Sequence, residues 1–238
     1  MTAAKPLPLK KTFSTILIDP PWRFQNRTGK VAPEHRRLHR YRTMSFEEIA
    51  QLPVGELAAP KSHLYLWTPN ALLPEAIDIM KRWGFRYKTN IIWYKVRKDG
   101  GPDGRGVGFY YRNVTEMVLF GVKGNLRTLA PARSQVNILI SRKQEHSRKP
   151  IQLYNTIERC SPGPYLELFA REKVPGWTQW GDELETYTDT KRVHKGYEGG
   201  AIADLSAARD KLRQRDRDRA LHDKGLGPML FPDEVNPD

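Results

Sequence analysis

The sequence is poor in cysteine and has no long apolar run. Cys160 is its single cysteine, so no internal disulfide can form and a reducing compartment is the natural setting. Residues 1–12 contain lysines but no apolar segment of signal-peptide length, and no stretch approaches the roughly 20 apolar residues that span a bilayer. We therefore expect an intracellular, cytoplasmic protein with no membrane partner.

A metal-binding pattern is also missing from the sequence. His35 and His39 are four residues apart, but they stand among arginines with no carboxylate pair or cysteine beside them. A zinc site would need more ligands than these two histidines. The sequence predicts no metal site.

Negative charge is scarce outside the C-terminal part of the chain. The 40 Lys and Arg residues exceed the 27 Asp and Glu residues, which gives a net charge of +13. Residues 186–238 hold as many acidic as basic residues, so the excess lies upstream, in three polar windows at residues 23–43, 95–113 and 123–149. We interpret these windows as loops that form a basic rim around a site that meets phosphates. Ordinary solubilising charge is the alternative.

Apolar residues alternate between strand-like and helix-like patterns. They make up 39% of the chain, which is enough to bury a core. The spacing predicts an α/β fold with three layers and a mostly parallel sheet, and strands on both sides of the second basic window predict a hairpin that makes the sheet mixed. The predicted strands are residues 14–18, 63–67, 87–94, 115–122, 136–140 and 165–170, and the predicted helices are residues 69–84 and 150–158, with a short helix after the capping box of Ser45 and Glu48.

The composition changes near Glu185. From there on, aspartate alternates with arginine and lysine and few large aliphatic residues occur. We predict a catalytic domain over residues 1–185 and a charged C-terminal extension, helical or partly disordered, over residues 186–238. The zero net charge of this extension argues against a direct role in DNA binding.

Four residues that follow the first predicted strand can carry chemistry on an adenine amine. The N6 amine is a poor nucleophile because its lone pair is delocalised into the ring, so a catalyst needs acceptors aimed at its two hydrogens. Asp19 supplies a carboxylate, Pro20 or Pro21 supplies a carbonyl on a rigid backbone, and Trp22 supplies an aromatic face for an unstacked base. We predict that these four residues are catalytic. An aspartate that caps a turn and a tryptophan that packs in the core are the alternatives.

Asp-Pro-Pro-Trp after a strand resembles the hallmark of amino-methyltransferases that act on adenine N6. Further motifs occur in order, from Tyr41-Arg42-Thr43-Met44-Ser45 through Leu64-Tyr65-Leu66-Trp67, Ile92-Trp93-Tyr94-Lys95, Phe120-Gly121-Val122-Lys123-Gly124-Asn125, Arg148-Lys149-Pro150, Ser161-Pro162-Gly163 and Glu167-Leu168-Phe169-Ala170-Arg171 to Trp180-Gly181. Together they resemble the methyltransferase A-seventy family, which includes the catalytic subunit of the eukaryotic messenger-RNA adenosine methyltransferase. The resemblance covers about residues 13–185.

This resemblance implies a Rossmann-like fold in permuted order, with the catalytic half before the cofactor half, and S-adenosylmethionine as cofactor. It implies that Asp19 lies between the target amine and the methionine end of the cofactor, that Lys149 pairs with the methionyl carboxylate, and that Arg171 lies near the ribose. Relatives carry an Asn-Gln pair where this chain has Asp182 and Glu183. The residues implied to bind the cofactor are Asp19, Lys149, Phe169, Arg171, Asp182 and Glu183.

Residues in and beside the basic windows are the candidates for substrate binding. They are Arg36, Arg37, Tyr41, Lys95, Arg112 and Glu116. Tyr41 either stacks on the substrate or packs over the sheet, and Glu116 either lines the target site or points outward from its strand. Glu167 is a further, weaker candidate. The alternatives are that Lys149 is a surface charge and that Glu167 is an exposed strand residue.

These features predict a methyltransferase that modifies the N6 amine of adenine in nucleic acid. The small size of the chain favours DNA, although RNA stays open because the basic loops suit either polymer. A non-catalytic nucleic-acid-binding subunit is the third hypothesis, and the intact Asp19 motif and Lys149 argue against it. A homodimer and a pairing with a related methyltransferase-like subunit both stay open.

Overall fold

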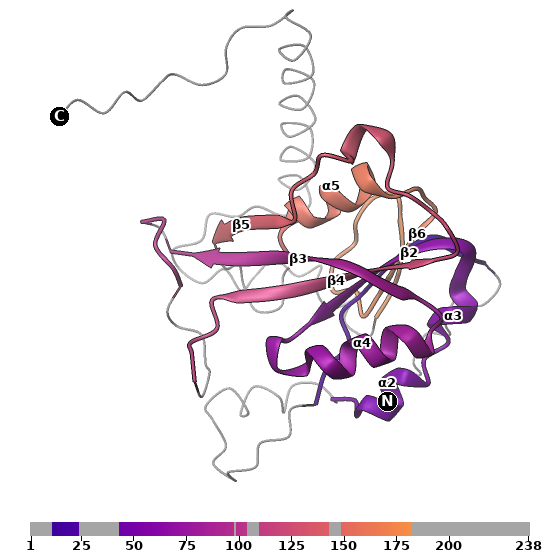
Figure 1. Ribbon diagram of the computed structural model, residues 1–238, viewed down its shortest axis with the longest axis horizontal. Coiled ribbons are helices and arrows are strands. Elements are labelled where there is room, and N and C mark those ends of the chain that lie inside the picture. The colour runs from indigo at the N-terminus through magenta and orange to yellow at the C-terminus, as the bar shows by residue number, and fades with distance from the viewer. Residues whose placement is uncertain (1–10, 24–42, 98, 104–109, 143–148, 182–238) are drawn as a thin grey trace, which may run out of the picture. The chain divides into compact units, whose positions relative to one another are not determined.

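A computed structural model describes residues 11–23, 43–97, 99–103, 110–142 and 149–181. In this part of the chain, seven strands form one sheet in the order β5-β3-β4-β2-β1-β6-β7 (Figure 1). The strands are β1 (Phe13–Ile18), β2 (Ala58–Thr68), β3 (Arg86–Val96), β4 (Thr115–Lys123), β5 (Ile138–Arg142), β6 (Tyr165–Leu168) and β7 (Trp177–Trp180).

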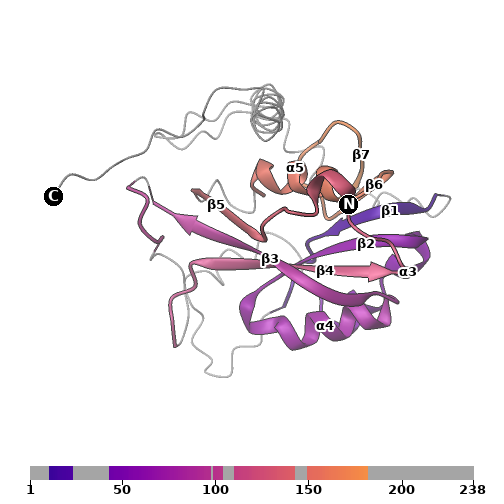
Figure 2. The same ribbon diagram turned by 45° about the horizontal axis from the view of Figure 1, so that its top comes forward.

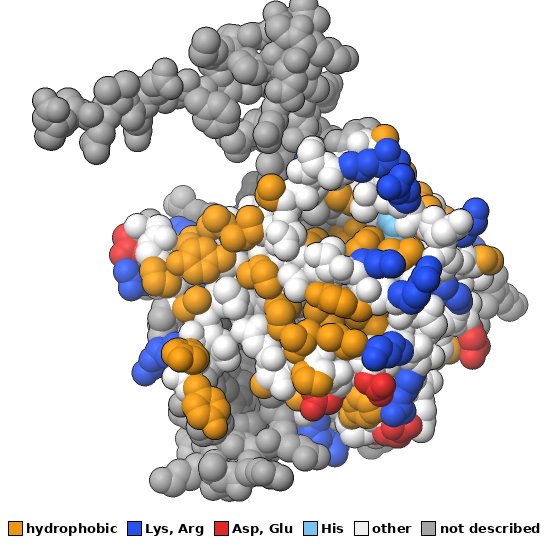
Figure 3. Space-filling view, viewed as in Figure 1, with side chains coloured by type: hydrophobic (Ala, Val, Ile, Leu, Met, Phe, Trp, Pro, Cys, Tyr) orange, Lys and Arg blue, Asp and Glu red, His pale blue; other side chains and the backbone are white. Residues whose placement is uncertain are grey.

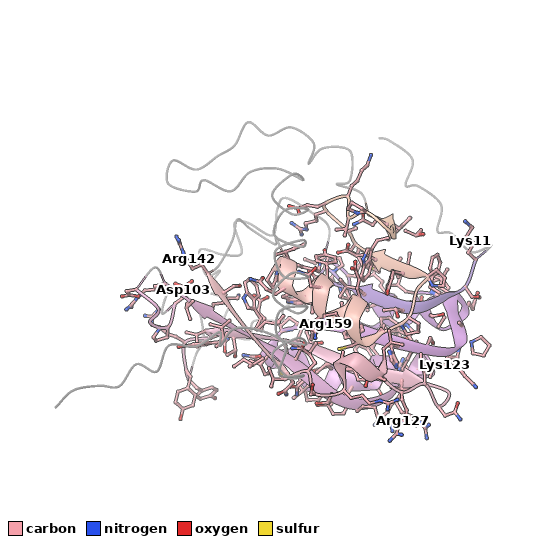
Figure 4. The ribbon with its side chains drawn as sticks, turned by 90° about the horizontal axis from the view of Figure 1, so that it is seen from above. Lys11, Asp103, Lys123, Arg127, Arg142 and Arg159 are labelled. Carbon is pink, nitrogen blue, oxygen red and sulfur yellow. The ribbon has the colours of Figure 1, made fainter. Side chains whose placement is uncertain are left out.

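Among these strands, β4 alone runs against the others. β1 pairs in parallel with β2 and β6, β6 pairs in parallel with β7, and β3 pairs in parallel with β5, whereas β4 is antiparallel to both β2 and β3. The parallel strands therefore end at one edge of the sheet, here called the carboxyl edge, and β4 begins there. Figure 4 shows these two ends: Asp103 lies past β3 and Arg142 ends β5, whereas Lys11 and Lys123 lie at the opposite end. The third basic window therefore begins at the end opposite the carboxyl edge, so its first residues do not join the rim that we expected. The expected mixed, mostly parallel sheet is confirmed.

Helices cover both faces of the sheet and give three layers. Figure 2 shows α4 (Leu73–Arg82) below the sheet and α5 (Ile151–Cys160) above it. The short helices α2 (Phe46–Ala50) and α3 (Val54–Leu57) share the core of the α4 layer, and the single-turn helices η1 (Asn70–Leu72) and η2 (Ala130–Ala132) lie in connections. The capping box is confirmed, because Ser45 and Glu48 each accept from the backbone N–H of the other at the start of α2.

Alternating side chains of the central strands divide the core into two halves. On β1, Ile16 and Ile18 pack in the α4 layer, whereas Leu17 packs in the α5 layer. On β2, Leu66 belongs to the first half and Trp67 to the second. Both faces of these strands are buried, as is usual for parallel strands between helical layers. A charged side chain on such a strand must therefore find a partner inside the protein.

Some elements differ from the prediction. The structure adds α3 and β7, which the sequence did not predict, and extends β2 to eleven residues. The strand expected at residues 136–140 occurs two residues later, as β5. It starts there because pairing with β3 begins only at Ile138, and Val136 before it is 64% exposed. The extension over residues 186–238 lies outside the described residues, so that division of the chain stays a prediction. In the described residues, no helix is both long enough and apolar enough to cross a membrane.

Candidate active site

Two neighbouring central strands end where candidate residues begin. Asp19 directly follows β1, and Phe169 directly follows β6, which pairs with β1 in parallel. The chain goes from β1 to β2 on one side and from β6 to β7 on the other side. The carboxyl edge between β1 and β6 is therefore a topological switch point, the place where open α/β sheets bind ligands.

A buried lysine joins two carboxylates at this switch point. Lys149 Nζ lies 3.2 Å from Asp19 Oδ2 and 3.3 Å from Glu167 Oε1. The side chains of Lys149 and Glu167 are only 5% and 1% exposed, whereas that of Asp19 is 25% exposed. The plainer readings of Lys149 as a surface charge and of Glu167 as an exposed strand residue are therefore wrong. Asp19 is the most exposed member of this three-residue cluster.

Three donors hold Glu167 in place. Besides Lys149, the Tyr154 hydroxyl donates to Oε1 at 3.0 Å and the Gln179 amide donates to Oε2 at 2.9 Å. Burial, and then the charge of Glu167, raise the pKa of Tyr154 well above its ordinary value, so this hydroxyl stays a donor. Gln179 is itself fixed by the Val174 N–H, which donates to its side-chain oxygen at 2.7 Å. Glu167 is therefore a rigid counterion for Lys149.

The cluster carries a formal charge of −1. Burial alone would lower the pKa of Lys149, but the attraction of Asp19 and Glu167 and their hydrogen bonds outweigh burial and raise that pKa. Lys149 is therefore a cation at neutral pH, paired with two carboxylates. Because net charge is costly away from water, the cluster favours a ligand that brings positive charge to Asp19.

The Asp-Pro-Pro-Trp backbone is fixed by hydrogen bonds on both sides. The Trp22 N–H donates to the Pro20 carbonyl at 2.8 Å, and the Met44 N–H donates to the Pro21 carbonyl at 2.8 Å. Both carbonyls thus have a backbone partner that the sequence did not predict, although each keeps a second acceptor position. Trp22 is 7% exposed and donates its indole N–H to the Trp67 carbonyl at 2.9 Å. Its role here is to anchor the tetrapeptide in the core, rather than to offer the open aromatic face that we expected.

A second charged pair lies farther along the carboxyl edge. The Trp67 indole N–H donates to Glu116 Oε2 at 2.7 Å, and the Lys95 ammonium contacts the other oxygen of Glu116. Lys149 Nζ lies 5.8 Å from the Trp67 ring centroid, so this tryptophan stands between the two charged groups. Glu116 is 33% exposed and Lys95 is 12% exposed. The structure thus brings together two of the residues that we predicted to bind the substrate.

The segment after β6 has an unusual backbone. Phe169 has a φ of 59°, which is uncommon for a residue other than glycine, and its ring meets that of Trp180 edge-on at 5.4 Å. A Cβ on Gly181 would lie 2.2 Å from the Ala170 carbonyl oxygen, so only glycine lets the chain after β7 approach so closely. Such local constraint is typical of functional sites. Arg171, two residues after Phe169, is partly exposed at this edge.

Of the remaining predicted site residues, one is described by the structure and five are not. Arg112 is exposed and lies just before β4, at the carboxyl edge. Within the described ranges, no group of three or more His, Cys, Asp or Glu side chains is placed to hold a metal ion. The predicted residues Arg36, Arg37, Tyr41, Asp182 and Glu183 lie outside the described residues.

Sequence reasoning missed Glu167 as the partner of Lys149, and it missed the two residues that hydrogen-bond to Glu167. Tyr154 and Gln179 were not candidates, and Glu167 was only a weak one. The available signal was the run Tyr165-Leu166-Glu167-Leu168, in which a charged residue interrupts an apolar strand. In a strand with both faces covered, such a residue must be paired.

Comparisons with known proteins identify the family of this chain. The MT-A70 family model matches residues 13–183. The type II methyltransferase M.MunI of Mycoplasma sp. is 30% identical over 194 residues, which are 75% of this chain and 80% of that protein. The human N(6)-adenine-specific methyltransferase METTL4 is 30% identical over 187 residues, 74% of this chain and 38% of that protein.

A third relative is named as a non-catalytic subunit. The Drosophila melanogaster METTL14, a non-catalytic subunit of an N(6)-adenosine-methyltransferase, is 28% identical over 216 residues, 84% of this chain and 53% of that protein. The chain therefore spans most of M.MunI but only about half or less of METTL14 and METTL4. With its Rossmann-like sheet and the family match over residues 13–183, this chain belongs to the MT-A70 family of methyltransferases.

Proposed function

We propose that this protein transfers a methyl group from S-adenosylmethionine to the N6 amine of adenine in nucleic acid, with DNA as the substrate. The observation that carries the proposal is the buried Lys149, held between Asp19 and Glu167 at the switch point of the sheet. The name of METTL4, an adenine-specific methyltransferase, supports the target base. The match with M.MunI over 80% of that protein supports methyl transfer by a chain of this small size, which is the feature that favours DNA.

The charges of the cluster suit this cofactor. S-adenosylmethionine carries a positive sulfonium, and its methionine end carries an ammonium and a carboxylate, so its net positive charge matches the −1 of the cluster. The Lys149 ammonium has three N–H donors, of which Asp19 and Glu167 account for two, so one is left for the methionyl carboxylate. When bound, the cofactor supplies an electrophilic methyl group. Phe169 and Arg171 would lie beside it at the end of β6, and Asp182 and Glu183 are proposed to meet the ribose.

Asp19 is proposed to orient the target amine. Lys149 contacts Asp19 Oδ2, which leaves Oδ1 available to accept one N6 hydrogen. The second acceptor position of the Pro20 carbonyl can take the other hydrogen. Two fixed acceptors pull both N–H bonds away from the lone pair and stabilise the positive charge that grows on nitrogen as the methyl group arrives.

The surrounding contacts keep these acceptors rigid. Trp22 ties the tetrapeptide to β2 through the Trp67 carbonyl, and Met44 ties it to the chain before α2. On the other side, Glu167 holds Lys149, and Lys149 holds Asp19. This arrangement favours catalysis by positioning, because the acceptors need not reorganise when the amine arrives.

Lys95 and Glu116 are proposed to contact the nucleotide that carries the target base. Glu116 stays partly exposed although it is fixed by Trp67 and Lys95. Its carboxylate can accept from a base edge, and the Lys95 ammonium can neutralise a phosphate. Arg112 is proposed to add a phosphate contact, and the same role is proposed for Arg36 and Arg37, with Tyr41 as a stacking residue.

The experiment is a methyl-transfer assay with four polymers. The protein is incubated with cofactor labelled in its methyl group and with single- or double-stranded DNA or RNA, and the nucleosides are then separated after digestion. We expect label in N6-methyldeoxyadenosine from DNA. Label only in N6-methyladenosine from RNA would change the substrate class. No transfer together with no cofactor binding at millimolar concentration would instead support a non-catalytic nucleic-acid-binding subunit.

A further inference from the structure

Two tyrosines stand in solvent at the carboxyl edge. Tyr110 is 95% exposed and Tyr111 is 87% exposed, more than any other large apolar or aromatic side chain of the described residues. They precede β4, the antiparallel strand that begins at the carboxyl edge, so they lie at the same end of the sheet as Asp19. Exposed aromatic rings bury nothing in the folded chain, so folding alone does not explain them.

The chain beside these tyrosines is anchored. The Asn70 amide, in η1 after β2, donates to the Asn113 side chain at 3.3 Å and to the Thr115 hydroxyl at 3.2 Å. Asn113 is only two residues from Tyr111, so the rings are held out from a fixed point. Glu116 lies five positions after Tyr111 along the chain, a span of at most about 18 Å. That span is about five base steps of a stacked strand.

Basic residues lie close to the pair along the chain. Arg112 follows directly and is exposed, and residues 95–113 hold five Lys and Arg residues against two Asp. In Figure 3, apolar side chains reach the surface at the left of the molecule, where β3 and β5 end in Figure 1, and blue Lys and Arg side chains lie among them. Aromatic rings next to cations suit bases and their phosphates, whereas the core of a protein interface is depleted of charge.

We propose that Tyr110 and Tyr111 form a stacking platform for unpaired bases that flank the target adenine. This inference rests on the proposed function and deepens it, because it names the substrate as a strand whose bases next to the target are unpaired. A ring can stack only on a base whose face is free, so a fully paired duplex cannot use the platform unless it opens. Arg112 beside the rings holds the phosphates of the same strand.

The test measures binding of fluorescently labelled oligonucleotides by anisotropy. The probes are a single strand with one adenine and the same strand in a duplex. Tyr110→Ala and Tyr111→Ala should each weaken single-strand binding by at least about five-fold, and the double variant should weaken it further. Tyr→Phe at either position should stay within about two-fold of the wild type, and Tyr→Leu should behave as Tyr→Ala because leucine has no π-face.

Tyr87→Ala is the matched control. Tyr87 is also exposed, at 37%, but it lies near the start of β3, at the opposite end of the sheet, so its loss should leave binding unchanged. The tyrosine variants should keep the wild-type slope of log affinity against log salt, because they remove no charge. Arg112→Gln should make that slope shallower by about one.

The outcomes separate the two proposals. If the wild type binds neither probe, the proposed function fails and the platform falls with it. If the wild type binds but both alanine variants bind equally well, the platform alone is overturned. If the alanine variants instead change the sedimentation of the protein alone, with oligonucleotide affinity unchanged, the tyrosines belong to a protein–protein interface and the platform is again overturned.

Discussion

Replacing Lys149 with methionine tests whether its buried ion pairs with Asp19 and Glu167 stabilise the fold. The substitution keeps most of the side-chain volume but leaves Glu167, 1% exposed, without its cation. Breaking a buried ion pair from one side costs about 3–5 kcal/mol in the free energy of unfolding. For a domain of this size, each kcal/mol lowers the midpoint of thermal unfolding by about 2–4 °C, so the expected loss is about 6–20 °C.

Urea denaturation followed by tryptophan fluorescence measures this loss in the absence of cofactor. Arg82→Met is the matched control, because Arg82 also contacts two carboxylates, Glu47 at 3.1 Å and Asp78 at 3.0 Å, but in solvent. Its loss should cost no more than about 1 kcal/mol. The double variant Lys149→Met/Glu167→Gln should recover part of the stability, because it removes the unpaired charge and keeps an acceptor for Tyr154. A cost for Lys149→Met no greater than that of the control would refute the reasoning, as would strict additivity in the double variant.

Three further predictions concern other parts of the site and the core. Burial lowers the pKa of His63, so below about pH 6.5 the unfolded chain takes up a proton that the folded chain does not; stability should fall as the pH is lowered. His63→Gln should remove part of this pH dependence, as measured by urea unfolding at pH 7.5 and 5.5. An equal change in the free energy of unfolding between these two pH values in the wild type and the variant would contradict the role given to His63. Gly181→Ala should cost about 1–3 kcal/mol and weaken cofactor binding, since its Cβ would overlap the Ala170 carbonyl; calorimetric titration showing wild-type affinity and stability would count against the close approach. Glu116→Gln should raise KM for the oligonucleotide and leave the cofactor Kd within about two-fold of the wild type. A raised cofactor Kd with an unchanged KM for the oligonucleotide would instead mean that Glu116 contacts the cofactor.

Strong local patterns made most of the fold predictable. The apolar runs at β1, β4 and β6 and the helical spacing of α4 and α5 occur close to where the sequence placed them. The four-residue strand β7 was missed because its apolar residues, Trp177 and Trp180, enclose two polar residues and show no clear period. Its pairing with β6 is decided by the tertiary fold, which overrides such a weak local signal.

The site was predicted less completely than the fold. Asp19 and Lys149 were selected as candidates through their motifs, but motifs do not show which side chains meet. Glu167 looked like an exposed strand residue because local alternation cannot show that β6 lies between β1 and β7. Trp22 was expected to face a base, and its burial became evident only when the contact with Trp67 was known.

The most direct measurement is the single-turnover rate of methyl transfer to adenine N6 by the Asp19→Asn variant, with the cofactor Kd measured alongside. Asparagine keeps the shape of the side chain but removes its charge and one acceptor, so we predict a rate loss of at least about 100-fold with cofactor affinity within a few-fold of the wild type. Asp78→Asn, which changes an exposed aspartate of α4, should transfer at the wild-type rate. Transfer by Asp19→Asn within a few-fold of the wild type would contradict the central role given to Asp19.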